Sequence, residues 1–426
     1  MEQSQPKSEK TIYIGITGDI IHPGIINIIQ KASTYGRVIV GLLTDSAIAP
    51  HKRLPYLTYD QRKNVIENIK GVSEVIPQKE WSYLPNLKKL RPNYIIHGDD
   101  WKTNYLQKIR AEVFTFMNEI GGEVIEIPYT QGIDADKLLE NAKSIGTTPD
   151  IRLKSLRVLI ESKPIVRILE AHSCLSALII ENLTVQNGED INRFDGIWNS
   201  SIIDSTSKGK PNLGLSNRMQ TLTEILESTT KPIIYDEDKI ITSSYLNYTI
   251  QNLECNGISA IVIRDQILRK NESLYDEKDF CNIIKEGKKA QITKDFMIIA
   301  RIEELIYGKS IDDALKRAIS CVMCGADAIL IEGKKAENIK EFCEKFRKEY
   351  PNTPIAVIPS NFKEVTEKEM SEWGVNIIIY ENQMLRASYP AMKKCAETIL
   401  ENQRSLEANS LCMPIKEILT LIPGTS

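Results

Sequence analysis

Three carboxylates, Asp236, Glu237 and Asp238, follow an apolar run in the stretch KPIIYDED. Acids gathered where a buried strand ends are typical of a magnesium site, because Mg²⁺ prefers oxygen ligands. No glycine follows to make a sharp turn; the next residues are 239–241, Lys-Ile-Ile. The stretch therefore predicts either a working metal site or the remnant of one, and solvated loop acids are the structural alternative.

A second candidate site lies in GITGDIIHPGIINII, where a strand, a glycine-containing turn, His22 and a helix follow one another. A helix N-terminus offers N–H groups and a positive dipole end to an anion, and His22 can donate to the same phosphate. Pro23 suits the first helical turn because its missing N–H is not needed there. A purely structural turn explains the same residues equally well.

The elements that would position the second site alternate between strand and helix. Strands are predicted at residues 11–17, 37–44, 74–78, 93–99 and 123–129, and helices at 24–36 and 58–71, the latter capped by Thr58. Continuous apolar strands separated by amphipathic helices favour a parallel sheet covered on both faces. This part of the chain is predicted to be a small Rossmann-like, doubly wound α/β domain.

The acids of the first site belong to a longer series of strand and helix patterns. Eight strands are predicted at residues 163–172, 194–201, 231–238, 257–265, 296–303, 325–333, 352–360 and 374–382. Eight βα units predict a closed (β/α)8 TIM-type barrel with its site at the carboxyl ends of the strands. Those ends carry His172, Ser200, Asp236, Asp238, Arg264, Arg301 and Glu332.

Length and composition agree with a two-domain α/β protein. The 426 residues are 42% hydrophobic and 26% charged, with a net charge of −3, which recruits neither nucleic acid nor an anionic membrane. The polar N-terminus and the lack of a long apolar run predict a cytoplasmic protein. Eight scattered cysteines indicate reduced thiols, and the C-x-x-C pair Cys321 and Cys324 is interpreted as core packing. The predicted divisions are a tail (1–10), a first domain (11–140), a linker (141–155) and a barrel with C-terminal helices (156–426).

Residues 11–140 resemble the cytidylyltransferase family through GDIIHPG, LLTDSAIAPHKRLPYLTYDQRKNVIENIKG and YIIHGDDW. The resemblance implies CTP as substrate and a nucleotide site made by Thr17, Gly18, His22, Lys52, His97, Asp99 and Trp101. Two positions depart from the family. Ile25 stands where the second histidine of an H-x-G-H turn belongs, and Asp134 and Asp136 stand in place of a hydroxyl-bearing turn. Loss of one charge-stabilising donor typically costs about 10²–10³ in rate.

Residues from about 152 to 420 resemble phosphoenolpyruvate mutase, of the isocitrate lyase superfamily, through segments such as FDGIWNSS, KPIIYDED, FMIIARIEELIYGKS and GADAILIEGKK. The resemblance implies Mg²⁺ as cofactor and transfer of a phosphoryl group from oxygen to carbon. It assigns Trp198, Ser200 and Ser201 to the oxyanion. It assigns Asp236 and Asp238 to the metal, Lys270 and Arg301 to the phosphate, and Asn212 to the gating loop.

Three charges depart from the mutase pattern. Arg264 stands where a glutamate of the metal shell belongs, and Glu272 and Glu332 stand where neutral or basic groups face the phosphate. We expect the Arg264 guanidinium to supply beside Asp236 the charge that magnesium supplies in the family. A like-charge contact at about 4 Å costs on the order of 4 kcal/mol at an effective dielectric near 20.

The order of the two domains resembles a phosphonate-pathway fusion, which leads to three hypotheses. The first is an active mutase acting on a small phosphorylated substrate. The second is a pseudoenzyme that serves as a binding, regulatory or assembly subunit, and the third is a redirected, metal-independent lyase. By resemblance, the C-terminal helix at YPAMKKCAETILENQ is expected to assemble the chain into a homo-oligomer, and the pseudoenzyme hypothesis adds pairing with an active paralogue.

Overall fold

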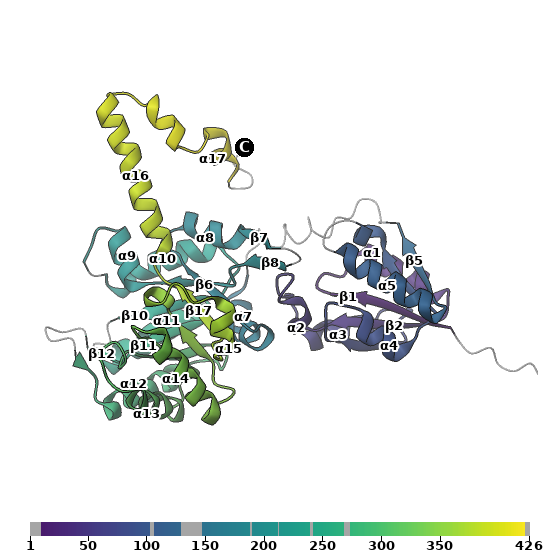
Figure 1. Ribbon diagram of the computed structural model, residues 1–426, viewed down its shortest axis with the longest axis horizontal. Coiled ribbons are helices and arrows are strands. Elements are labelled where there is room, and N and C mark those ends of the chain that lie inside the picture. Colours follow the sequence, from purple (N-terminus) through teal and green to yellow (C-terminus); the bar gives the residue numbers. More distant parts are fainter. Residues whose placement is uncertain are drawn as a thin grey trace, which may run out of the picture.

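The computed structural model describes residues 10–102, 106–128, 147–187, 190–211, 213–238, 242–267 and 273–421. It comprises an N-terminal α/β unit, a larger barrel unit and a helical arm at the C-terminal end (Figure 1). Asn212, Lys270 and Glu272 lie outside the described residues, as do Asp134 and Asp136.

The N-terminal unit is built on a parallel five-stranded sheet, ordered β3-β2-β1-β4-β5. Its strands are β1 (Thr11–Ile16), β2 (Arg37–Leu43), β3 (Glu74–Gln78), β4 (Tyr94–Gly98) and β5 (Glu123–Ile127). Ile12 and Ile14 pack on one face while Tyr13 packs on the other, so apolar cores cover both faces as the continuous apolar strands predicted. The chain first adds strands on one side of β1 and then on the other, so β1 and β4 flank the topological switch point of the sheet. Open α/β sheets bind their ligands at this point.

The helices around this sheet include two that the sequence predicted. The elements are α1 (Pro23–Ser33), α2 (Asp45–Ile48), α3 (Tyr59–Glu67), α4 (Leu84–Leu90), the short 3-10 helix η1 (Asp99–Lys102) and α5 (Gln107–Ile120). Thr58 caps α3 in a reciprocal capping box with Gln61, which confirms the predicted cap.

The barrel is closed and contains all eight predicted strands. They are β6 (Val166–Glu170), β9 (Gly196–Asn199), β10 (Ile233–Glu237), β11 (Ala260–Arg264), β14 (Met297–Ile302), β15 (Ala328–Ile331), β16 (Ile355–Val357) and β17 (Ile377–Tyr380). Alternate residues fill an inner barrel core, for example Ile234, Val262 and Ile299. Their neighbours in sequence pack outward against the helices.

The surrounding helices follow the strands, as βα units require. They are α8 (Cys174–Asn182), α9 (Ser201–Ser207), α10 (Leu215–Ser228), α11 (Ser243–Cys255), α12 (Glu277–Ala290), α13 (Ile311–Met323), α14 (Ala336–Glu349), the 3-10 helix η3 (Pro359–Asn361) and α15 (Glu367–Glu372). An earlier helix, α7 (Pro149–Ser162), adds Leu156 and Leu159 to the inner barrel core and begins within the predicted linker.

Two small hairpins were not predicted from the sequence. One pairs β7 (Thr184–Asn187) with β8 (Asp190–Arg193), and the other pairs β12 (Gln266–Ile267) with β13 (Ser273–Leu274). The first hairpin contacts the N-terminal unit, because Arg193 donates from Nη2 to the carbonyl oxygen of His51 at 2.6 Å. Leu54, from the same N-terminal segment, packs against the inner barrel core.

The chain ends in an arm that extends away from the barrel, formed by α16 (Gln383–Asn402), η4 (Glu407–Leu411) and α17 (Ile415–Thr420) (Figure 1). No residue of α16 or α17 is buried. Across the described ranges, no helix has the length and apolar character needed to cross a bilayer.

Candidate functional sites

The barrel mouth is an ionic network at the carboxyl ends of four consecutive strands, β10, β11, β14 and β15. We define it by Asp236, Arg264, Arg301, Glu303 and Glu332. Asp236 is the centre of this network and is only 2% exposed. Both of its carboxylate oxygens accept from Arg264 Nη2, at 3.0 and 2.9 Å. The predicted contact between Arg264 and Asp236 is therefore present.

Arg301 is surrounded by carboxylates of the mouth. Its Nη2 lies 2.7 Å from Glu332, its Nε lies 2.8 Å from Glu303, and its Nη1 lies 3.5 Å from Asp236. Sequence reasoning assigned Arg301 to a substrate phosphate and had Glu332 facing that phosphate. In the structure the two side chains pair with each other, which matches the alternative interpretation of Arg301 as a structural ion-pairing residue.

A third arginine supports the mouth from α10 and was missed by sequence reasoning. Arg218 donates to the backbone oxygen of Asp236 at 2.6 Å and to the side chain of Asn199 at 2.8 Å. Its guanidinium also lies over the Tyr235 ring, 3.9 Å from the ring centre. Nothing in the local pattern LSNRMQ marks this arginine, because its partners lie 18 and 19 residues away, on β10 and β9.

Burial and the charged groups of the mouth shift the pKa values of its carboxyl groups. Burial pushes the pKa of Asp236 upward, but Arg264, Arg301 and Arg218 outweigh burial and hold it at about 2. Burial raises the pKa of Glu303, with Arg301 opposing it. Burial likewise raises the pKa of Glu381, which follows β17. The mouth thus keeps Asp236 ionised and favours the protonated forms of Glu303 and Glu381.

The residues present do not fit magnesium. Asp238 is half-buried directly after β10, and in the described part of the chain Asp236 forms ion pairs with two guanidinium groups, those of Arg264 and Arg301. Among the described residues, no group of three or more His, Cys, Asp or Glu side chains is arranged to hold a metal ion. A hard divalent cation would have to displace Arg264 and would then meet its charge.

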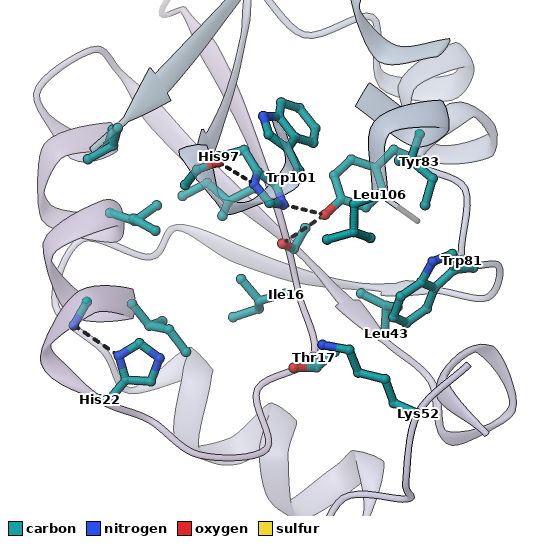
Figure 2. A pocket seen from close by; sticks show the side chains of 18 of the residues that line it. Ile16, Thr17, His22, Leu43, Lys52, Trp81, Tyr83, His97, Trp101 and Leu106 are labelled. Carbon is teal, nitrogen blue, oxygen red and sulfur yellow. Dashed lines mark hydrogen bonds between the residues drawn. The ribbon is translucent and has the colours of Figure 1, made fainter. Parts of the chain in front are cut away.

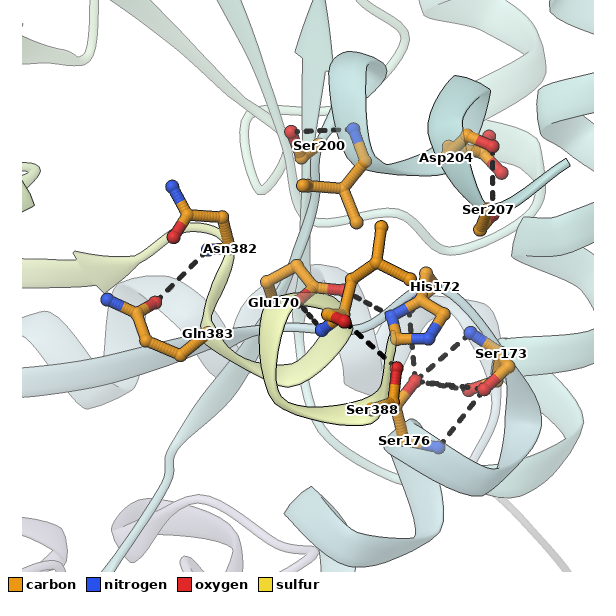
Figure 3. Close-up of polar contacts among 12 residues, drawn as sticks. Glu170, His172, Ser173, Ser176, Ser200, Asp204, Ser207, Asn382, Gln383 and Ser388 are labelled. Carbon is orange, nitrogen blue, oxygen red and sulfur yellow. Dashed lines mark hydrogen bonds and ion pairs between the residues drawn. The ribbon is translucent and has the colours of Figure 1, made fainter. Parts of the chain in front are cut away.

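Of the three residues predicted to cradle an oxyanion, Ser201 contacts this network directly. Ser201 donates from Oγ to Asp236 at 3.0 Å, and Ser200 caps α9 by accepting from the Ile203 N–H (Figure 3). Trp198 is fully buried in the inner barrel core. The backbone here turns into α9, while the Ser201 hydroxyl is already committed to Asp236.

His172 sits on the opposite side of the mouth, where it contacts a buried acid. Its Nδ1 lies 2.6 Å from Glu170, which is fully buried and also accepts from the backbone N–H of Leu385 in α16 (Figure 3). His172 therefore fits the structural alternative, and Glu170 ties the first turn of the C-terminal arm to the barrel.

The second site is a cavity of about 230 Å³ in the N-terminal unit, between the ends of β1 and β4 (Figure 2). Five of the predicted nucleotide-binding residues line it: Thr17, His22, Lys52, His97 and Trp101. Gly18 and Asp99 do not line it; Gly18 takes a left-handed φ of 66° in the turn after β1, and Asp99 begins η1.

His22 has a structural role as well as a place in the cavity wall. It caps α1, its Nδ1 accepting from the N–H of Gly24 at 3.1 Å, and burial lowers its pKa. A neutral ring that accepts at Nδ1 carries its proton on Nε2, so a single N–H donor remains for a ligand. Ile25, which follows Gly24 in the same turn, also lines this cavity.

His97 and Trp101 form a stacked pair at the far end of the cavity, with ring centres 4.0 Å apart and planes 4° apart. His97 Nε2 lies 3.0 Å from the Tyr83 hydroxyl and Nδ1 lies 2.8 Å from the Gly98 oxygen. Trp101 donates to Glu126 at 2.7 Å. The polar atoms of both side chains thus have partners within the protein. What the two side chains present to a ligand is mainly the faces and edges of their aromatic rings.

The fold and the sites define the class of protein: a two-unit α/β protein in which a doubly wound, nucleotidyltransferase-type unit is joined to a (β/α)8 barrel with charged strand ends. The chain belongs to the phosphoenolpyruvate phosphomutase family, whose profile matches residues 156–400. A cytidylyltransferase-like profile matches residues 14–145. The two resemblances noted in the sequence are confirmed.

Individual relatives of the barrel carry several activities. A phosphoenolpyruvate phosphomutase of Tetrahymena pyriformis is 32% identical over 62% of this chain and 89% of its own length. A phosphonopyruvate hydrolase of a Variovorax strain is 28% identical over 63% of this chain and 93% of its own length. A solved phosphonopyruvate hydrolase, complexed with oxalate and Mg²⁺, has a TM-score of 0.57 and 28% identity and covers 63% of this chain and 94% of its own.

The N-terminal unit has its own relative. A glycerol-3-phosphate cytidylyltransferase of Bacillus spizizenii is 32% identical over 32% of this chain and 99% of the relative. Each relative therefore matches one of the two units, and the match covers about nine tenths or more of the relative's own length.

Proposed function

We propose that this chain is a phosphonate-biosynthesis-type fusion protein whose barrel has given up magnesium-dependent mutase chemistry and acts as a binding, regulatory or assembly subunit. The observation that carries the proposal is the Arg264–Asp236 ion pair, at 2.9 Å and almost fully buried. Removing one partner of such a pair typically costs about 3–5 kcal/mol, so an incoming cation would have to compensate for that loss.

The ion pairs of Arg301 with carboxylates of the protein support the same conclusion. Phosphoryl transfer depends on cations that face the transferred group. Arg301 instead lies among Glu303, Glu332 and Asp236, each within 3.5 Å. A phosphorylated carboxylate entering the mouth would meet these acids before it met a free cation.

The proposal extends to the N-terminal unit, where we infer that cytidylyl transfer from CTP is lost. Ile25 removes one of two histidines, and His22 spends one ring nitrogen on capping α1. The loss of one transition-state donor alone costs about 10²–10³ in rate.

Two active alternatives have specific support. The mutase reaction, phosphoenolpyruvate to phosphonopyruvate, is favoured by the named activity of the Tetrahymena relative and by the retention of Ser201 and Asp236. A redirected lyase is favoured by a 2,3-dimethylmalate lyase of Eubacterium barkeri that is 25% identical over 82% of its length. Both remain outcomes of the experiment below.

We also propose a cytoplasmic homo-oligomer, or a complex with an active paralogue. All eight cysteines are free thiols, as is usual in a reducing compartment. The unburied helix α16 supplies the surface for assembly.

The test is calorimetric titration of the full chain with oxalate, with and without Mg²⁺, beside the phosphonopyruvate hydrolase as positive control. We expect that Mg²⁺ neither promotes oxalate binding nor raises the melting temperature of this chain. Turnover of phosphoenolpyruvate is measured in parallel with an irreversible decarboxylase that removes phosphonopyruvate.

A variant sharpens this test. Arg264→Glu restores an acid beside Asp236, so we expect Mg²⁺ to stabilise the variant but not the native chain. A ligand at 100 times its dissociation constant stabilises by about 2.7 kcal/mol, which a thermal shift detects readily. Mg²⁺-dependent oxalate binding or phosphonopyruvate formation by the native chain would overturn the proposal, whether or not the variant folds.

A further inference from the structure

The N-terminal cavity separates its polar groups from an apolar body. Figure 2 shows Thr17, His22 and Lys52 on one side of the cavity, Tyr83, His97 and Trp101 on the other, and Ile16 between them. The far polar atoms are tied to the protein, since His97 contacts Tyr83 and Gly98 through its two ring nitrogens. A ligand's charged group would therefore be received at the Lys52 side.

The Lys52 side can balance about one negative charge. Lys52 is the single Lys or Arg in the described lining, and its ammonium has no ion-pair partner among the described residues. No Asp or Glu belongs to that lining. Thr17 adds a hydroxyl and His22 adds one neutral N–H.

The start of α1 adds little further capacity for anions. Pro23 has no N–H, the Gly24 N–H donates to His22 Nδ1, and the Ile25 N–H donates to the His22 oxygen at 3.0 Å. The N–H groups that a helix N-terminus offers to a phosphate are thus already used within the first turn.

The rest of the wall is apolar and encloses a small volume. Its isoleucine and leucine lining consists of Ile14, Ile16, Ile25, Ile28, Leu43, Leu106, Ile109 and Ile127. The volume of about 230 Å³ lies below the range of roughly 300–1,000 Å³ typical of pockets for drug-sized ligands. A triphosphate carries several negative charges, and the Lys52 ammonium can balance only about one of them. The uncompensated charges would lie beside aliphatic side chains, and burying an unpaired charge costs free energy.

We propose that this cavity binds a compact organic anion, a molecule with a single terminal anionic group, either a carboxylate or a phosphate monoester, on an uncharged apolar body of about one ring. The anionic group lies at Lys52, Thr17 and His22. The body packs on Ile16, Ile25 and Leu43 and reaches toward the stacked pair of His97 and Trp101. This inference rests on the loss of cytidylyl transfer proposed above.

The experiment titrates the full chain calorimetrically with phenylacetate, phenyl phosphate, benzyl alcohol and CTP with Mg²⁺. We expect saturable binding of phenylacetate or phenyl phosphate with a Kd at or below about 1 mM and at least tenfold weaker binding of benzyl alcohol. Whichever anion binds identifies the carboxylate or the phosphate as the recognised group. CTP is expected to bind more weakly than that anion.

Three variants locate the binding. Lys52→Met should weaken the anions at least tenfold and leave benzyl alcohol unchanged, whereas Lys88→Met, on the exposed face of α4, should change nothing. Ile109→Trp, which fills the cavity from α5, should abolish binding of all probes.

Tighter binding of CTP than of either anion, no saturable binding of either anion, or binding that ignores Lys52→Met would each overturn this inference. Pyrophosphate release from CTP is followed in the same preparation. Turnover of CTP overturns the proposed loss of transfer itself, whereas no turnover together with no anion binding overturns only the inference of a compact-anion site.

Discussion

Arg264 shows how far a single residue could be interpreted from the sequence. Its position in a strand end that resembles a metal shell predicted a contact with Asp236, and the two side chains do pair. The partners of Arg301 and the role of Arg218 could not be predicted. Their contacts depend on which side chains from distant strands converge, and that information is absent from the local pattern.

Asp265, immediately after Arg264, gives a test of buried charge at the residue scale. It is fully buried, accepts from the Glu303 N–H at 3.1 Å, and lies 3.6 Å from Arg317. Burial raises its pKa to about 7, with Arg317 opposing the rise and Glu303 and Glu304 adding to it. An aspartate in the unfolded chain titrates near a pKa of about 3.9.

Between about pH 4 and pH 7 the folded protein therefore keeps a proton on Asp265 that the unfolded chain has already lost. The free energy of unfolding should fall as the pH rises through this window and stay low above it. Asp265→Asn retains the acceptor for Glu303 and removes the charge, so we expect the variant to be more stable than the native chain at pH 8 by a few kcal/mol. Urea unfolding at pH 5 and pH 8 measures the difference.

Asp279→Asn, at an exposed position of α12, is the control and should leave the pH dependence of unfolding as it is in the native chain. Loss of stability at both pH values in Asp265→Asn would show that Arg317 keeps the carboxylate ionised in the folded state.

At the scale of elements, the strands that were predicted are those with long apolar runs. The run AIVIR of β11 is buried throughout, so its sequence and its burial carry the same signal. The hairpin of β7 and β8 was missed because TVQN is polar and exposed, and a pair of short polar strands has no such periodicity. The start of α7 was missed because its role in closing the barrel depends on tertiary packing.

The segment around Leu54 links the two units and provides a prediction at this scale. Leu54 packs against the inner barrel core, close to the contact between Arg193 and His51. We expect Leu54→Asp to place a charge against apolar side chains and to separate thermal unfolding into two transitions, with a loss of about 1–3 kcal/mol. Differential scanning calorimetry detects the second transition.

Leu57→Asp is the matched control, because Leu57 lies in the same segment and is 38% exposed. A single transition, unchanged in temperature in Leu54→Asp, would mean that the two units are not coupled through this segment.

On the scale of the whole molecule, the longest helix of the described residues lies on the surface. α16 has 20 residues and none is buried, while Tyr389, Met392 and Leu400 expose more than half of their surface. An isolated helix is marginal in water, and exposed apolar patches mark interaction sites. Its first turn is tied to the barrel, through the hydrogen bond from the Leu385 N–H to Glu170 and through Met384, which packs against the outer barrel core.

If α16 is the assembly surface of a homo-oligomer, a charge on its apolar face should dissociate the protein. We expect Leu400→Lys to shift the mass measured by light scattering after gel filtration from a multiple of the chain mass to that of one chain. Asn402→Lys adds the same charge two residues away, at an exposed position, and should leave the oligomer intact. A native chain that already elutes as a single chain would contradict assembly with itself and leave the paralogue as the partner of α16. Equal dissociation by both variants would place the cause in net charge, since a packed apolar contact would respond only to Leu400.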